Sequence, residues 1–186
     1  MSNWGTMSYR TVSTVRRWAA LFPAAVATLV LVPAALAAST AMVGKPAPDF
    51  GLAAVAGDNV RLSEYRGQPV IVSFWSSSCS TCTRQLAALD KLYATYRSSG
   101  LVVLGVSVDD NLARAREYAH ARATSYPLLL DVQKSVSRDF LIDRLPTTIL
   151  IDRRGVIRYV HSDDGADQRS YVVQIRTLLD DKPAVP

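Results

Sequence analysis

Cys79 and Cys82 are the two cysteines of this 186-residue chain, and two residues separate them. Sulfurs at this spacing can close into a disulfide or open into two thiols, so the pair can exchange two electrons with another thiol or disulfide. A bridge across two residues closes too short a loop to stabilise a domain much, which excludes a disulfide-rich scaffold. A zinc site needs about four ligands, and only His120 and His161 could join the pair. Both histidines fit surface positions better, so we favour redox chemistry and expect no metal.

The cysteines fall between a predicted strand and a predicted helix. Residues 69–75 form a compact β-branched and aromatic run, which is typical of a central strand in a parallel sheet. A serine-rich turn over residues 76–80 follows this strand. The helix after the turn carries apolar residues at spacings of three and four and should end near Gly100; these residues are Leu86, Leu89, Leu92, Tyr93 and Tyr96.

The start of a helix is a favourable place for a reactive sulfur. Unpaired N–H groups and the positive end of the helix dipole stabilise a thiolate there. We therefore expect Cys79 to have the lower pKa and to be the nucleophile. Cys82 lies one turn along, faces inward, and is placed to resolve a mixed disulfide by attacking Cys79.

The rest of the chain predicts an α/β fold around a mixed sheet. An extended entry over residues 45–50 leads into a short β-hairpin over residues 51–60 and a helical turn at 62–67. Further strands are expected at residues 101–108, 126–131, 147–152 and 156–160, and further helices at 112–123, 135–141 and 166–179. Asp109, Asp110 and Asn111 are candidates to cap the helix that begins at Leu112.

The N-terminal segment reads as an export signal. Basic residues precede an uncharged stretch over residues 18–44, and Ala35-Leu36-Ala37 is a small-x-small cleavage pattern. We expect cleavage after Ala37, although the apolar segment is about long enough to span a bilayer as a retained anchor. The domain organisation is therefore a signal over residues 1–37, a linker over 38–46 and one folded domain over 47–182. In either case the domain lies outside the cytoplasm, in the periplasm or cell envelope or secreted.

The basic charge of the chain belongs largely to this signal. The formal net charge is +5, from 21 basic and 16 acidic residues. Without Arg10, Arg16 and Arg17 the count becomes 18 basic against 16 acidic residues. Such a balance indicates a solvated mixed surface, so we expect no nucleic-acid partner. Contact with a membrane is expected only through the N-terminal segment, if that segment is not cleaved.

Four motifs, in order, resemble the extracytoplasmic TlpA/ResA/DsbE-like thiol-disulfide oxidoreductases of the thioredoxin superfamily. The resemblance covers about residues 45–180. Its motifs are Lys45-Pro-Ala-Pro-Asp-Phe, Leu62-Ser-Glu-Tyr-Arg-Gly-Gln-Pro-Val, Val72-Ser-Phe-Trp-Ser-Ser-Ser-Cys-Ser-Thr-Cys and Leu145-Pro-Thr-Thr-Ile-Leu-Ile-Asp-Arg-Arg-Gly. The family implies a thioredoxin-like fold, in which a central mixed β-sheet is flanked by helices and extended by an N-terminal β-hairpin.

The resemblance also implies roles for particular residues. Pro146 would be a cis proline beside the CxxC pair, and the backbone of Leu145 would pair with the substrate chain by strand addition. Trp75 would flank the active site and contact the substrate, or else be a core aromatic. The implied activity is reduction of protein disulfides, such as those of apocytochrome c or metal sites, without a cofactor. A membrane thiol carrier would return electrons to Cys79 and Cys82.

The chain departs from the family pattern around the cysteines. Ser78 replaces the usual aromatic residue before the first cysteine, and Thr81 replaces the common proline before the second. Gln85 and Ser73 stand where family members and thioredoxins carry acids. Without these carboxylates Cys82 lacks its obvious proton acceptors, so Ser73, Gln85 or water would have to manage that proton.

Two other functions remain open at this stage. A copper-binding metallochaperone of the related Sco type has the same fold, but it uses a wider cysteine spacing and a distal histidine, where this chain has Pro146. A thiol peroxidase of the peroxiredoxin type carries a threonine three residues before its reactive cysteine and a proline further back. Ser76 could imitate that threonine, whereas Val72 stands at the place of the proline.

Overall fold

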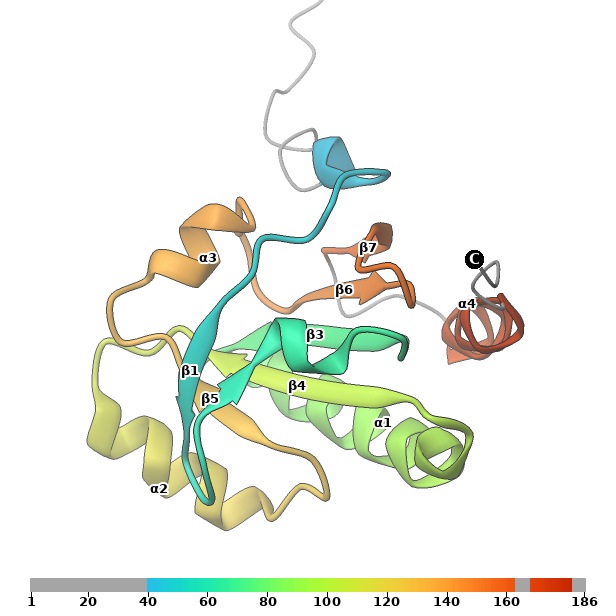
Figure 1. The fold of residues 1–186 in the computed structure, drawn as a ribbon. Helices are drawn as coiled ribbons and strands as arrows, with labels where there is room; N and C mark the ends of the chain where they lie inside the picture. The colour runs from blue at the N-terminus through green and yellow to red at the C-terminus, as the bar shows by residue number, and fades with distance from the viewer. Residues whose placement is uncertain (1–39, 163–167, 182–186) are drawn as a thin grey trace, which may run out of the picture. The chain divides into compact units, whose positions relative to one another are not determined.

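A seven-stranded sheet forms the centre of this computed structural model, which describes residues 40–162 and 168–181 (Figure 1). Across the sheet the strand order is β2-β1-β5-β4-β3-β6-β7. The neighbours among β3, β4 and β5 run parallel, and all other neighbours run antiparallel, so the predicted mixed sheet is confirmed. The strands are β1 (Gly51–Ala54), β2 (Val60–Arg61), β3 (Val70–Trp75), β4 (Val102–Ser107), β5 (Leu128–Leu130), β6 (Thr147–Ile151) and β7 (Ile157–His161).

Helices cover both faces of the sheet. Residues of α1 (Ser80–Tyr96), α2 (Leu112–Arg122) and α4 (Gln168–Asp180) share one apolar core with Ile71 and Trp75 of β3. The short helix α3 (Ser135–Asp139) packs with Val72 and Phe74 on the opposite face. Three 3-10 turns complete the described elements: η2 (Thr40–Met42), η3 (Leu62–Tyr65) and η4 (Arg97–Ser99). None of the helices in the described ranges is long and apolar enough to cross a membrane.

Strand β3 is buried on both faces over its whole length, as its apolar sequence predicts. It pairs with β4 on one side and with β6 on the other. Gly105 on β4 allows close packing here, because a Cβ at this position would lie 2.5 Å from the Leu128 side chain and 3.3 Å from Nε1 of Trp75. The strand that leads to the cysteines therefore lies at the buried centre of the sheet.

Most predicted elements are present with small shifts at their ends. The hairpin of β1 and β2 pairs as expected, and Gly100 ends the first helix region with a φ of +94°. The predicted strand over residues 126–131 is shorter and spans Leu128–Leu130, followed directly by Asp131. Its carboxylate accepts N–H bonds from Val136 and Ser137 at the start of α3, at 3.3 and 2.8 Å.

The segment before Ala47 is part of the folded unit. Met42 in η2 is buried, the N–H of Gly44 donates to the Ile157 carbonyl at 2.8 Å, and Pro46 bridges to Val156. The expected linker over residues 38–46 stays a prediction as a domain boundary, and within it Gly44, Lys45 and Pro46 contact β7 and the residue before it. The predicted export signal over residues 1–37 lies outside the described residues and stays a prediction.

Candidate active site

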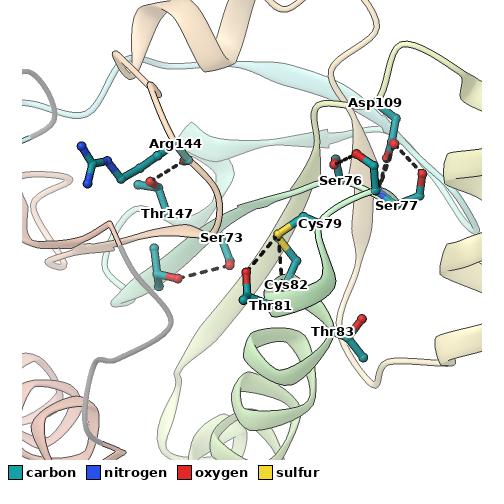
Figure 2. The surroundings of a disulfide bond; sticks show 12 residues. Ser73, Ser76, Ser77, Cys79, Thr81, Cys82, Thr83, Asp109, Arg144 and Thr147 are labelled. Atoms are coloured by element: carbon teal, nitrogen blue, oxygen red, sulfur yellow. Dashed lines mark hydrogen bonds between the residues drawn. A yellow bond between two sulfur atoms is a disulfide. The ribbon is translucent and has the colours of Figure 1, made fainter. Parts of the chain in front are cut away.

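A disulfide joins Cys79 and Cys82 at the start of α1 (Figure 2). Their Cα atoms are 5.3 Å apart. Cys79 occupies the N-cap of the helix with an extended backbone, and Cys82 lies in the first turn. The turn before the helix closes through a hydrogen bond from the Cys79 N–H to the Ser76 carbonyl at 3.1 Å. Strand, turn and helix follow one another as the sequence predicts.

The two sulfurs differ in access. Cys79 is half-buried. Cys82 is 0% exposed and belongs to the apolar core between the sheet and helices α1, α2 and α4. The sulfur of Cys79 accepts the N–H of Cys82 at 3.1 Å, and the hydroxyl of Thr81 lies 3.4 Å away. These groups would also stabilise a Cys79 thiolate in the reduced protein. The roles of Cys79 as nucleophile and Cys82 as resolving residue stay predictions, and this arrangement supports them.

The turn before Cys79 is held by an acid that the sequence reasoning assigned elsewhere. We expected Asp109, Asp110 or Asn111 to cap α2, and the Asn111 side chain does so by accepting the Arg114 N–H at 3.0 Å. The Asp109 carboxylate instead accepts the backbone N–H of Ser77 at 2.9 Å (Figure 2). A usable signal existed, because Asp109 follows a parallel strand beside β3, and such strand ends meet at one edge of a sheet.

The Leu145–Pro146 peptide bond is cis. Thr147, the next residue, pairs with Phe74, which places Pro146 at the end of β3 that leads into the cysteine turn. The Thr147 hydroxyl donates to the Arg144 carbonyl at 2.9 Å and fixes the preceding loop. The topology thus brings Leu145 and Pro146 to the edge of the sheet that carries the disulfide. Their contact with a substrate chain stays a prediction.

Trp75 is a core residue in this structure. Its side chain is fully buried and stacks on Tyr118 of α2, with ring centroids 5.2 Å apart. Within the described residues its Nε1 has no hydrogen-bond partner. The Tyr118 hydroxyl in turn hydrogen-bonds to Thr83 on α1. Since Trp75 exposes no surface, its position fits the core alternative better than a direct substrate contact.

A buried network of neutral polar groups lies between the sheet and helices α1 and α4. The Ser73 and Thr148 hydroxyls are 3.2 Å apart. The side-chain nitrogen of Gln85 donates to Thr148 at 3.0 Å and to the Tyr171 hydroxyl at 2.9 Å. The side chains named here, all within the described residues, include no carboxylate. Sequence reasoning missed Thr148 and Tyr171, since no local pattern marks them.

The two histidines lie apart from the disulfide. His161 ends β7, forms a 2.8 Å hydrogen bond with Gln174 and packs against the ring of Tyr171. His120 is exposed on α2. Among the residues that the structure describes, no group of three or more histidine, cysteine or acidic side chains could hold a metal ion.

The chain is similar in sequence to known thiol-disulfide oxidoreductases and thioredoxin-like proteins. Residues 43–160 match the AhpC/TSA family. The thiol-disulfide oxidoreductase ResA of Geobacillus kaustophilus (strain HTA426) is 34% identical over 118 residues, which cover 63% of this chain and 68% of that protein. The thioredoxin-like protein YneN of Bacillus subtilis (strain 168) is 31% identical over 121 residues, which cover 63% and 70%.

Solved structures of related proteins have the same architecture. A protein named as a thiol:disulfide interchange protein DsbE, from Chlorobium tepidum, matches with a TM-score of 0.70 at 28% identity, covering 74% of this chain and 97% of that one. The thioredoxin domain of a thiol-disulfide oxidoreductase from Bacteroides vulgatus matches with a TM-score of 0.64 at 25% identity, covering 73% and 97%. The expected thioredoxin-like fold is confirmed.

Proposed function

This chain belongs to the AhpC/TSA family and is a thiol-disulfide oxidoreductase of the ResA and DsbE type, and from that premise we propose that it reduces protein disulfides outside the cytoplasm. The observation that carries the proposal is the unequal placement of the two sulfurs. Cys79 is half-exposed at the N-terminus of α1, and Cys82 is buried directly behind it.

The proposed reaction starts from the reduced protein. The Cys79 thiolate attacks one sulfur of a substrate disulfide, and the other substrate sulfur leaves as a thiolate and takes up a proton. Cys82 then loses its proton and attacks the Cys79 sulfur, which releases the second substrate sulfur as a thiol. Two electrons and two protons pass to the substrate, and the protein ends with the Cys79–Cys82 disulfide seen here.

The substrate chain would dock along the loop before β6. Leu145 precedes the cis bond, is half-buried, and sits at the edge of the sheet that carries the cysteines. Its backbone could pair with an extended substrate segment, a mode of binding that reads shape more than sequence. Trp75 would support this surface from the core rather than contact the substrate.

A source of electrons is required after each turnover. We propose a membrane thiol carrier as the donor, as the resemblance to the TlpA/ResA/DsbE-like proteins implies. The uncharged N-terminal stretch over residues 18–44, with basic residues before it, supports export of the domain to the cell envelope. The substrates would be apocytochrome c or metal-site cysteines that must be kept reduced.

Replacement of single cysteines tests the reaction. The Cys79→Ser variant should lose at least about a thousandfold of the rate of insulin disulfide reduction, because no nucleophile remains at the accessible position. Far-UV circular dichroism would verify that the variant is folded. Full activity of Cys79→Ser would rule out the proposed mechanism.

The other two candidate functions can be tested on the same protein. A metallochaperone would bind Cu(I) with the cysteines reduced, and a thiol peroxidase would consume hydrogen peroxide at a rate that depends on Cys79. We expect no Cu(I) binding by the reduced cysteines. We also expect peroxide consumption to be slower than the reduction of insulin disulfides. Peroxide turnover faster than insulin reduction would favour the peroxidase assignment.

A further inference from the structure

Asp109, which follows β4, forms hydrogen bonds with the turn that carries Cys79. The Ser77 N–H lies 2.9 Å from both carboxylate oxygens, and the Ser77 hydroxyl lies 2.6 Å from Oδ1. The hydroxyl of Ser107 donates to Oδ2 at 2.8 Å. Figure 2 shows Asp109 and Ser77 near the disulfide, with the carboxylate directed toward the turn. All the donors point at the acid, as they do around an ionised carboxylate, which can only accept.

The charge of this carboxylate is balanced by hydrogen bonds rather than by a cation. Asp109 is buried, so water screens its charge less than at the surface. Lys134 reaches the neighbouring carbonyl of Val108, but its ammonium pairs with Asp110 at 3.2 Å. Within the described residues no cation forms an ion pair with Asp109.

Other titratable groups lie on the elements around the turn. Asp143 and Arg144, before β6, pair with each other at 3.7 Å. Tyr118 on α2 hydrogen-bonds to Thr83, and Arg84 on α1 is exposed. Among the described residues, Asp109 is therefore a buried carboxylate without an ion-pair partner, and it binds Ser77, two residues before Cys79.

We propose that Asp109 is a positioning residue that fixes the turn before Cys79 and, through its negative charge, limits ionisation of the Cys79 thiol. This inference rests on the proposed function in taking Cys79 as the attacking sulfur. The start of α1 favours the thiolate, and Asp109 opposes it. A less stable thiolate makes the dithiol a better electron donor, since stabilisation of the reduced form is what makes a pair oxidising. Asp109 thus biases the pair toward reduction of substrates.

The test is the pH dependence of Cys79 alkylation. All proteins carry Cys82→Ser, so that Cys79 is the only thiol of the chain. The reagent is iodoacetamide, whose lack of charge means that Asp109 acts on the thiol and not on the reagent. Asp109→Asn keeps an acceptor for the Ser77 N–H and removes the charge. Asp110→Asn is the matched control, because that neighbouring carboxylate is 99% exposed and pairs with Lys134.

We expect Asp109→Asn to lower the alkylation midpoint by about half a pH unit, which is about threefold in the ionisation constant of the thiol. Asp110→Asn should leave the midpoint within about a tenth of a unit. A purely structural role of Asp109 would change the melting temperature without moving the midpoint. An unchanged or raised midpoint, or an equal shift in Asp110→Asn, would overturn the proposal.

A second measurement needs no substitution of Asp109. Two charges influence each other reciprocally, so ionisation of Cys79 must perturb the Asp109 carboxyl. In the reduced Cys82→Ser protein, the Asp109 carboxyl ¹³C resonance should show a step at the pH where Cys79 ionises. In the Cys79→Ser,Cys82→Ser protein that step should be gone, and a flat resonance in both would contradict the inference. Neither readout requires a substrate, so a failed disulfide-reduction assay would not affect them.

Discussion

At the scale of single residues, the sulfurs of Cys79 and Cys82 lie in different surroundings. Cys79 meets the unpaired N–H groups of a helix start, which favour its thiolate. Cys82 is fully buried, and burial disfavours a charged sulfur. We therefore expect Cys82 to stay protonated until a mixed disulfide on Cys79 brings a target within reach. On this prediction Cys79 attacks first.

The amide of Gln85 holds together the neutral network in the core. Gln85→Leu keeps the volume but removes the donor to the Thr148 and Tyr171 hydroxyls. We expect a loss of about 1–3 kcal/mol in the free energy of unfolding, because buried polar groups lose a partner. Urea denaturation measures this loss. Gln68→Leu, at an exposed site, is the control, and an equal effect of both variants would contradict the assigned role.

The cysteine pair could be predicted from the sequence because its members are neighbours in the chain. The contacts around it are harder to predict, because they join residues that lie far apart in the chain. Asp109 reaches Ser77 across 32 residues, and Thr148 reaches Gln85 across 63. Such contacts follow from the strand order, and no local periodicity encodes them. Trp75 shows the same limit, since its stacking on Tyr118 depends on the placement of α2.

At the scale of elements, the hairpin of β6 and β7 depends on one buried acid. The Asp152 carboxylate accepts the N–H groups of Arg154 and Val156 at 2.9 Å, and the guanidinium groups of Arg154 and Arg158 lie 3.2 and 3.3 Å away. Burial by itself would raise the pKa of Asp152, but these hydrogen bonds and Arg154 hold the pKa below its usual value. The turn between the two strands is built around this carboxylate.

Acid should weaken this hairpin. In the unfolded chain Asp152 takes up a proton near pH 4, before the folded protein does, so its stabilising effect is present above about pH 4 and is lost as the pH falls further. We expect Asp152→Asn to cost about 1–2 kcal/mol at pH 6 and to flatten the fall in stability below pH 4. Urea titrations between pH 3 and pH 6 measure both, with Asp58→Asn as the exposed control. Equal pH profiles for wild type and Asp152→Asn would refute this account.

Helix α3 ends on a leucine where glycine is usual. The N–H of Leu141 bonds to the Arg138 carbonyl and that of Ile142 to the Ser137 carbonyl, which together form a Schellman motif. Leu141 has a φ of +53° and is 46% exposed. A side chain in this left-handed conformation carries a cost that glycine avoids.

Leu141→Gly should therefore raise the free energy of unfolding by about 1 kcal/mol. Leu141→Ala is the matched control, since it removes the exposed side chain and keeps the backbone cost. Thermal unfolding of both variants separates these two contributions. If Leu141→Ala stabilises as much as Leu141→Gly, the left-handed backbone is not the cause.

At the scale of the whole described fold, the sheet order gathers the functional parts at one edge. The parallel strands β3 and β4 end at the cysteine turn and at Asp109, and β6 begins there after Pro146 (Figure 1). The class of fold and the cysteine site could be predicted because strand and helix patterns are local. The order of strands and the packing of residues 40–46 on β7 could not, because they depend on long-range pairing.

The direction of electron flow should be reflected in the difference in stability between the oxidised and reduced forms of the protein. A pair that acts as a reductant favours its disulfide in the folded state, so reduction must destabilise the protein. We expect the free energy of unfolding of the oxidised form to exceed that of the reduced form by only about 1 kcal/mol, because the bridge closes a short loop. Urea denaturation with and without excess dithiothreitol measures the difference. A more stable reduced form is the mark of an oxidant and would reverse the proposed direction.

The most direct test of the account is to trap the reaction halfway. In the Cys82→Ser protein the mixed disulfide cannot be resolved, so we predict that Cys79 accumulates covalent adducts with substrate proteins in cells. Mass spectrometry should find these adducts on Cys79, and treatment with dithiothreitol should release them. The Cys79→Ser variant should carry no such adducts. An absence of protein adducts on Cys82→Ser, or equal adducts on Cys82 in Cys79→Ser, would contradict the assignment of the two cysteines.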